Sequence, residues 1–224
     1  MKRTTKWIWG SILILVFLAA IFVFLYRETI LVKAGHFMAP TGDYTADVVI
    51  LEGTGYIRTG FIEAGMDLLS SRKVKRIIVV IHQIALGSSP FGINGDYPDV
   101  VRQKLRDMGL KEQEFKIIVT PIRNPVTLKE AKTVLDTLSQ DHIKSAILVA
   151  PSFHTRRSYL AYQYVSKPLQ IKIYPMAYFP DHHQDKWWTD QMRLRDFVVE
   201  SIKLVYYLVF GHIPFYSNVS RGLR

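Results

Sequence analysis

A short segment with side chains that can bind phosphate and move protons follows one of the apolar runs of this sequence. Residues 152–157 (SFHTRR) carry a hydroxyl, an imidazole and two guanidinium groups, and they lie between the apolar run 145–150 and a helical pattern. Donors at the start of a helix suit a phosphate or an oxyanion. Ser152, Arg156 and Arg157 are therefore candidate ligand-binding residues. The alternative is a basic, solvated helix start.

His154 is the candidate general acid or base, because the unperturbed pKa of an imidazole lies near neutrality. Ser152 is a poor candidate nucleophile, since the sequence shows no acid that would orient the histidine. A Ser-His-Asp hydrolase is therefore disfavoured.

A glycine-containing turn follows another apolar run, residues 47–51. Gly53 and Gly55 have no Cβ and leave room for a phosphate to approach backbone amides, and Arg58 adds a fork of donors at the start of the next helical pattern; Thr54, between the glycines, is a further candidate ligand-binding residue. A tight strand-to-helix turn explains the same residues without a ligand. A nicotinamide dinucleotide site is disfavoured, because Arg58 replaces the third glycine and the next run ends in His82 rather than an acid. His82 is itself a candidate ligand-binding residue.

Two further polar groups have simpler readings. Thr127 and Glu130 stand three apart at the start of a predicted helix, a spacing that predicts a capping box. Residues 181–185 (DHHQD) look like a metal cluster, but adjacent histidines point apart and no i, i+4 pair is present, so we expect a surface loop. No metal site and no cofactor is assigned from the sequence.

The elements that position these residues alternate along the chain. Short apolar runs rich in β-branched residues predict strands, and they are 47–51, 76–81, 115–119, 145–150 and 170–174. Amphipathic stretches between them predict helices at 59–71, 98–108, 127–138 and 155–165, with Gly109 as a cap. Nearly continuous apolar strands indicate burial on both faces. We therefore predict a Rossmann-like α/β fold, a three-layer sandwich around a mainly parallel sheet of about five strands.

In such a sheet, ligands bind beyond the carboxyl ends of the strands, which is where the polar residues above fall. Residues 82–97 form a long irregular segment that could cover this edge as a lid. The last apolar pattern, residues 187–210, predicts a helix docked on the sheet. A second membrane span is the rival reading, and the charged residues within this segment disfavour it.

The N-terminal segment predicts a membrane anchor. Residues 7–26 contain no charge and at 1.5 Å per residue match a hydrocarbon core of about 30 Å. Lys2, Arg3 and Lys6 precede this run, which favours a cytoplasmic N-terminus and an extracytoplasmic domain, held to the lipids of the cytoplasmic (inner) membrane by a retained signal anchor. A cleaved signal peptide and a buried core helix are the alternatives. We expect the anchor at residues 1–33 and one domain at 34–224, beginning with a short linker that contains Gly35, Pro40 and Gly42.

Composition narrows the range of partners. The formal net charge of +10 favours anions such as lipid head groups, envelope polymers or a phosphorylated ligand. Nucleic acid is disfavoured, because no base-reading motif or lysine-rich arm is present. The absence of cysteine is compatible with an exported domain that folds without disulfides.

Several motifs together resemble the YdcF/SanA/ElyC family of bacterial envelope-associated proteins. They are DVVILEGTGYIR at 47–58, T-x-x-E-A at 127–131, SFHTRRS at 152–158, and the Trp-Trp, Glu200 and Lys203 pattern near the C-terminus. The resemblance spans most of the chain after the anchor. It departs from the family after the second strand, where a Ser-Gly turn is replaced by His82-Gln83.

The resemblance implies a Rossmann-like domain, a link to envelope or peptidoglycan maintenance, and a cleft at the strand ends. It carries a ligand role onto Gly53, Gly55, Arg58, Thr127, Glu130, His154 and Arg157. The leading hypothesis is a domain that binds a small phosphorylated or nucleotide-like ligand between Arg58 and Arg157, with His154 available for proton transfer; if it is an enzyme, it is a transferase or hydrolase. The alternatives are a non-catalytic sensing or binding module and a structural envelope protein, either of which could have envelope proteins as partners.

Overall fold

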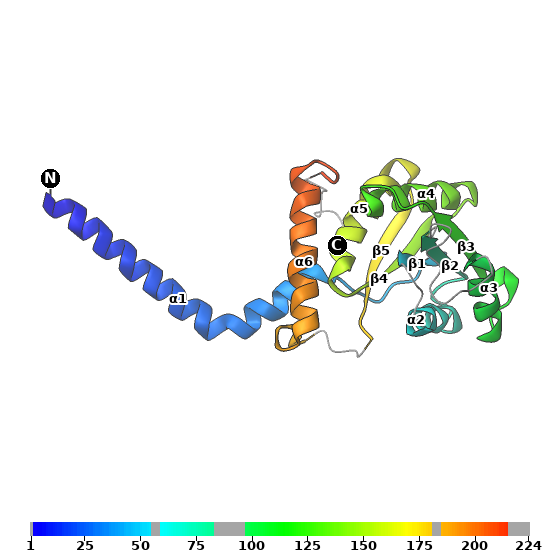
Figure 1. The fold of residues 1–224 in the computed structure, drawn as a ribbon, viewed down its shortest axis with the longest axis horizontal. Helices are drawn as coiled ribbons and strands as arrows, with labels where there is room; N and C mark the ends of the chain where they lie inside the picture. The colour runs from blue at the N-terminus through cyan, green and yellow to red at the C-terminus, as the bar shows by residue number, and fades with distance from the viewer. Residues whose placement is uncertain (1, 55–58, 83–96, 181–184, 215–224) are drawn as a thin grey trace.

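The structure is a computed structural model of the chain that describes residues 2–54, 59–82, 97–180 and 185–214. It confirms the predicted α/β fold (Figure 1). Five strands form one sheet in the order β3-β2-β1-β4-β5, and every pair of neighbours is parallel. The strands are β1 (Val48–Thr54), β2 (Arg76–His82), β3 (Phe115–Thr120), β4 (Ser145–Pro151) and β5 (Lys172–Tyr178).

The helices connect the strands as the sequence predicts. They are α2 (Thr59–Ser70), α3 (Tyr97–Asp107), α4 (Val126–Gln140) and α5 (Thr155–Leu169), with the single turns η2 (Glu112–Glu114) and η3 (Ser152–His154). Gly109 has a φ of +92° just after α3, a backbone conformation that glycine adopts without strain. Its predicted role in ending that helix is therefore confirmed.

Two apolar layers enclose the sheet. On one face, alternate strand residues such as Leu51 and Val79 pack against Phe61 and Leu105, from α2 and α3. On the other face, the intervening strand residues pack against α4 and α5, where Tyr162 is fully buried. Burial on both faces explains why the strand sequences are nearly continuous apolar runs.

The chain order creates a switch point beside β1. The chain passes from β1 to β2 on one side, whereas β4 pairs with the opposite edge of β1. The connection after β1 therefore runs to β2 on one side of the sheet, and the connection after β4 runs to β5 on the other. Ligands of open α/β sheets bind in the crevice that forms at such a point.

The N-terminal helix α1 (Lys2–Met38) is long and apolar enough to cross a membrane, and an 18-residue window within it has a mean hydropathy of 2.2. The expected linker is wrong at Gly35, because α1 continues unbroken to Met38 and its last turns pack on the domain, whereas Pro40 and Gly42 lie in an irregular stretch before β1. A Cβ at Gly35 would lie 2.7 Å from the indole Nε1 of Trp187, so glycine permits this close packing.

The last helix, α6 (Gln191–Val209), lies between α1 and the sheet (Figure 1). A third apolar cluster joins it to α1, to η3 and to the turn η4 (Trp187–Thr189), with Met38, Phe153, Trp187, Leu204 and Tyr207 buried. The segment is thus a helix of the domain, as predicted. It does not lie on a sheet face, however, but across η3 and α5, at the end of the sheet where β4 finishes.

Candidate functional site

The candidate site lies at the carboxyl ends of β1 and β4, on the two sides of the switch point. Glu52 and Gly53 are near the end of β1, and His154 closes the turn η3 that follows β4. The two strands are paired in register, with Leu51 opposite Val149, so their ends meet at one edge. The sequence prediction that polar residues gather at this edge is confirmed for these positions.

Gly53 brings the end of β1 against a buried acid. Its backbone N–H donates to Glu130 Oε1 at 3.3 Å. A Cβ at this position would lie 2.6 Å from Glu130 Oε2 and 2.8 Å from His82 Nε2, closer than side-chain atoms approach one another. Glycine is needed here because of this contact with two side chains, and not because of an unusual φ.

His82 and Glu130 form a pair at this edge. His82 is the last residue of β2, and its Nε2 lies 2.6 Å from Glu130 Oε2. Tyr162 donates its hydroxyl to Glu130 Oε1 at 2.8 Å. The bond with Glu130 raises the pKa of His82, while burial raises the pKa of Glu130. Both shifts favour a proton shared between the two groups.

The predicted capping box at Thr127 and Glu130 is wrong. Helix α4 has Pro125 at its N-cap and no side-chain capping bond. Thr127 instead accepts a hydrogen bond from Arg157, and Glu130 turns inward to Gly53, His82 and Tyr162. Both residues are buried. The structure therefore places these two residues at the candidate site, where the resemblance had put them.

His154 is held between two carboxylates. Its Nε2 lies 3.0 Å from Glu52 Oε1, and its Nδ1 lies 3.0 Å from Glu200 Oε2. Burial alone would lower the pKa of His154, but the charge of Glu52 and the hydrogen bond with Glu200 outweigh it and raise the pKa to about 9. The two carboxylates thus favour the charged imidazole at neutral pH, with one ring nitrogen facing each of them.

Arg157 joins this group to α4 and α6. Its Nε and Nη2 donate to Glu200 Oε2 at 3.1 and 2.9 Å, and its Nη1 donates to Thr127 at 2.6 Å. Nη2 also lies 2.6 Å from His154 Nδ1, where it can donate when the imidazole is neutral. The guanidinium stacks over Tyr207 and its side chain is only 6% exposed. Arg157 thus forms part of the wall of the site.

The neighbouring arginine has a different role. Arg156 donates to the backbone carbonyl of Phe37 and stacks over that residue's ring, 4.3 Å from its centroid. It therefore fixes the end of α1 to α5, and the structure does not bring it to the strand ends. Ser152 has a φ of +44° and lines the cleft beside His154. The side chain of Thr54, together with Gly55 and Arg58, lies outside the described residues, as do residues 83–96 of the lid predicted at 82–97 and residues 181–184.

Three charged residues that were not among the predicted site residues belong to the site. Glu52 is buried and accepts from Ser158 as well as facing His154. Glu200 and Lys203 come from α6 and pair with each other at 2.8 Å. Burial would raise the pKa of Glu200, but bonding to His154 and the charges of His154 and Arg157 hold that pKa well below its usual range. The signal in the sequence was an acid at the end of a buried strand and an E-x-x-K spacing on the last helix.

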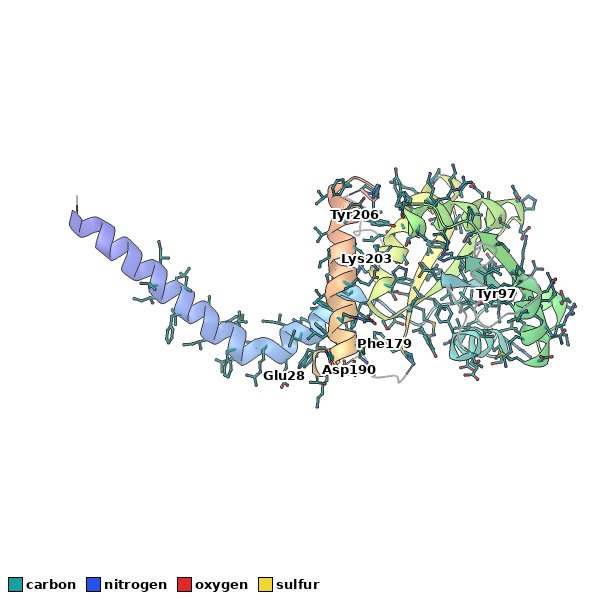
Figure 2. The ribbon with its side chains drawn as sticks, viewed as in Figure 1. Glu28, Tyr97, Phe179, Asp190, Lys203 and Tyr206 are labelled. Atoms are coloured by element: carbon teal, nitrogen blue, oxygen red, sulfur yellow. The ribbon has the colours of Figure 1, made fainter. Side chains whose placement is uncertain are left out.

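Two adjoining clefts open onto these groups. Their volumes are about 640 and 670 Å³, within the range of small-molecule sites. Four residues line both of them: Gly53, His154, Arg157 and Lys203. Figure 2 labels Lys203 and Tyr206 on α6, the helix that forms one wall. Glu52 Oε2 is buried and has no hydrogen-bond partner among the described residues.

This arrangement can bind a polar anion and donate a proton. The basic side chains that line the clefts are His82, His154, Arg157, Arg195, Lys203 and His212, and the acids are Glu52, Glu130, Asp196 and Glu200. The raised pKa of His154 adds its charge to those of Arg157 and Lys203, and these three cations face the carboxylates of Glu52 and Glu200. Within the described part of the chain, no group of three or more His, Asp or Glu residues has the geometry to hold a metal ion.

The fold and the site together define a class: a parallel α/β domain with a cleft at its switch point, joined to one helix able to span a membrane. Comparison with family models and with curated proteins finds no match for this chain.

Proposed function

We propose that this chain is a membrane-anchored extracytoplasmic domain that binds a small anionic ligand, phosphorylated or nucleotide-like, at the carboxyl edge of its sheet. The observation that carries the proposal is the position of His154 at the cleft, between Glu52 and Glu200 and beside Arg157, where the two acids raise the pKa of its ring. A buried cation fixed in this way attracts an anion more strongly than one in water does. The resemblance to the YdcF/SanA/ElyC family supports a role in cell-envelope or peptidoglycan maintenance.

Lys203 is the residue best placed to meet the ligand first. Its side chain is 51% exposed, it lines both clefts, and its partner is Glu200. Arg157 acts from behind, because its bonds to Glu200 and Thr127 occupy its guanidinium. The sequence predicted that Arg157 would bind the ligand directly. We propose instead that Lys203 and His154 bind it, and that Arg157 holds the imidazole in place.

Glu52 adds a second requirement on the ligand. Its Oε2 is buried without a partner among the described residues, and Glu52 lines one of the two clefts. A buried carboxylate oxygen is stabilised by a hydrogen-bond donor. We therefore favour a ligand that carries a hydroxyl or amino group next to its phosphate, as sugar phosphates and nucleotides do.

Catalysis would use the same imidazole. A transferase or hydrolase that breaks a phosphate ester or anhydride needs an acid for the oxygen of the leaving group, and the imidazolium of His154 can donate that proton. Its two N–H groups are already bonded to Glu52 and Glu200, so the ligand must displace one of these contacts. A non-catalytic sensor is the second candidate function, because each charged group in this network already has a partner of opposite charge.

The orientation of the anchor is part of the proposal. Lys2, Arg3 and Lys6 before the apolar run outnumber Arg27 and Lys33 after it, which favours a cytoplasmic N-terminus. We expect the domain to be digested by protease added to intact spheroplasts. Protection that disappears only on lysis would place the domain in the cytoplasm and overturn this orientation.

The binding site is tested with the full chain in lipid nanodiscs and a panel of sugar phosphates, nucleotides and inorganic phosphate. A ligand at one hundred times its Kd raises the free energy of unfolding by about 2.7 kcal/mol, which is visible as a higher Tm. We expect Lys203→Ala to lose this shift and Lys172→Ala, an exposed residue at the opposite end of the sheet, to keep it. Equal Tm shifts in both variants would show that the ligand does not bind at this edge of the sheet.

Turnover separates the two candidate functions. His154→Gln keeps a hydrogen-bond donor but cannot act as an acid. If this variant binds the ligand found in the panel but no longer consumes it, the result supports the proposal that the domain is an enzyme. If the wild-type protein binds the ligand without consuming it, the domain is a sensor.

A further inference from the structure

The outer face of α6 is apolar and exposed. A surface helix normally turns its apolar stripe to the core and its polar side to water. On α6, most residues that point away from the domain are large and apolar, with exposed fractions between 42% and 70%. These residues, which we call the outer face of α6, are Leu194, Val198, Ile202, Val205 and Val209.

The spacing shows that these residues form one stripe. Positions 194, 198, 202, 205 and 209 follow each other at three- and four-residue steps, which places them on one side of a helix. Leu204 and Tyr207 occupy the opposite side and are buried against the domain. Val199, Tyr206 and Phe210 widen the exposed stripe, with Arg195 as a charged residue inside it. The helix is thus apolar on both of its sides.

The position of α1 brings this stripe close to the bilayer. The uncharged run ends at Tyr26, and the carbonyl of Leu31, five residues later, accepts from the indole N–H of Trp187 at 3.0 Å. Five helical residues span about 8 Å, close to the thickness of one head-group layer. Trp187 lies just before α6, so the start of that helix is within about this distance of the membrane surface. Figure 1 shows α6 on the side of the domain from which α1 leaves.

The connection between α1 and the domain is firmly packed. Met38 is buried in the cluster that also contains Trp187 and Leu204, and Arg156 binds the carbonyl and the ring of Phe37. A domain on a long flexible linker could turn any face to the lipid. This packing keeps α6 on the membrane side.

We propose that the outer face of α6 lies in the interfacial region of the bilayer that α1 spans, and that its partner is a lipid surface with anionic head groups. Arg193 and Arg195, near the start of the helix, and the formal net charge of +10 suit such a surface. The domain is then held by two elements, one that crosses the membrane and one that lies along it. The clefts lined by Lys203 and Tyr206 of the same helix open close to the lipid.

The chain contains no cysteine, so single spin labels can be attached without removing native residues. We would reconstitute the full chain with Ile202→Cys or Val205→Cys, at residues 64% and 58% exposed, into vesicles of phosphatidylcholine and phosphatidylglycerol. Val100→Cys on α3, at 39% exposure and on the far side of the sheet in Figure 1, is the control. Collisions with oxygen report contact with lipid, and collisions with a water-soluble nickel chelate report contact with water.

We expect the ratio of oxygen to nickel collisions to be several-fold higher at positions 202 and 205 than at position 100. Equal ratios would overturn the proposal. The proposal would also be overturned if labels on α6 were shielded from both reagents in vesicles but exposed to the nickel chelate at one chain per nanodisc. That result would mean that a second copy of the chain covers this face. The test needs no ligand, so its result is independent of the proposed function.

Discussion

His154 is expected to make the stability of this domain depend on pH above neutrality. Its folded-state pKa is about 9, against 6.5 for the unperturbed side chain, because Glu52 and Glu200 stabilise the charged ring. The folded state therefore keeps a proton that the unfolded state releases. Its contribution to stability is fully present below pH 6.5 and is lost as the pH rises to 9.

The magnitude follows from the difference between the two pKa values. Each pH unit corresponds to about 1.4 kcal/mol, so the shift from 6.5 to about 9 is worth about 3 kcal/mol. The His154→Gln variant has no group that titrates at this position. We expect the free energy of unfolding of the wild type to fall by about 3 kcal/mol, relative to the variant, between pH 6 and pH 9.5.

The assay is urea unfolding of the intact chain in detergent micelles at several pH values, followed by tryptophan fluorescence. Trp187 is buried in the cluster that joins α1 to α6 and reports unfolding of the domain. Comparing the two proteins at each pH removes the contribution of other titrating groups. A difference between wild type and variant that stays constant from pH 6 to 9.5 would refute the assigned charge of His154. An NMR titration of the ring, with a midpoint near 6.5, would refute it directly.

The remaining predictions concern the pair at the end of β2. Gly53→Ala would place a Cβ against Glu130 and His82, so we expect a loss of about 1–3 kcal/mol in urea unfolding and a lower pKa for His82 by NMR. Tyr162→Phe removes a donor from the buried carboxylate of Glu130, which should cost about 1–3 kcal/mol. Tyr159→Phe, on the same helix but half-buried, should cost much less, and equal costs would contradict the role assigned to Glu130.

Local sequence patterns were enough to predict the sheet and most of the helices. The run RIIVVI, for example, predicts a strand at 76–81, and β2 spans Arg76–His82. After Arg76 this run is apolar at every position, and a short β-branched run of that kind is typical of a strand buried on both faces. The same argument placed Gly53 and His154 at one edge of the sheet, because the carboxyl ends of parallel strands lie together.

The partners of individual side chains could not be predicted in this way. Thr127 and Glu130 have the spacing of a capping box, yet Glu130 binds Gly53 and His82, which are 77 and 48 residues away in the sequence. The three-residue spacing of Thr127 and Glu130 is compatible with a capping box and equally with the bonds that the structure shows. Only the position of β1 and β2 beside α4 decides which bonds form.

The two adjacent arginines show the same distinction. The sequence determined that a basic helix start follows β4 and that an apolar helix precedes the domain, because charge, hydropathy and periodicity are local properties. Only the tertiary structure decided that Arg157 binds Glu200 while Arg156 binds α1. Neighbouring residues on a helix point about 100° apart, so the elements packed on each side select their partners. Those elements are α6 and the end of α1, which approach α5 from distant parts of the chain through the packing of Met38, Trp187 and Leu204.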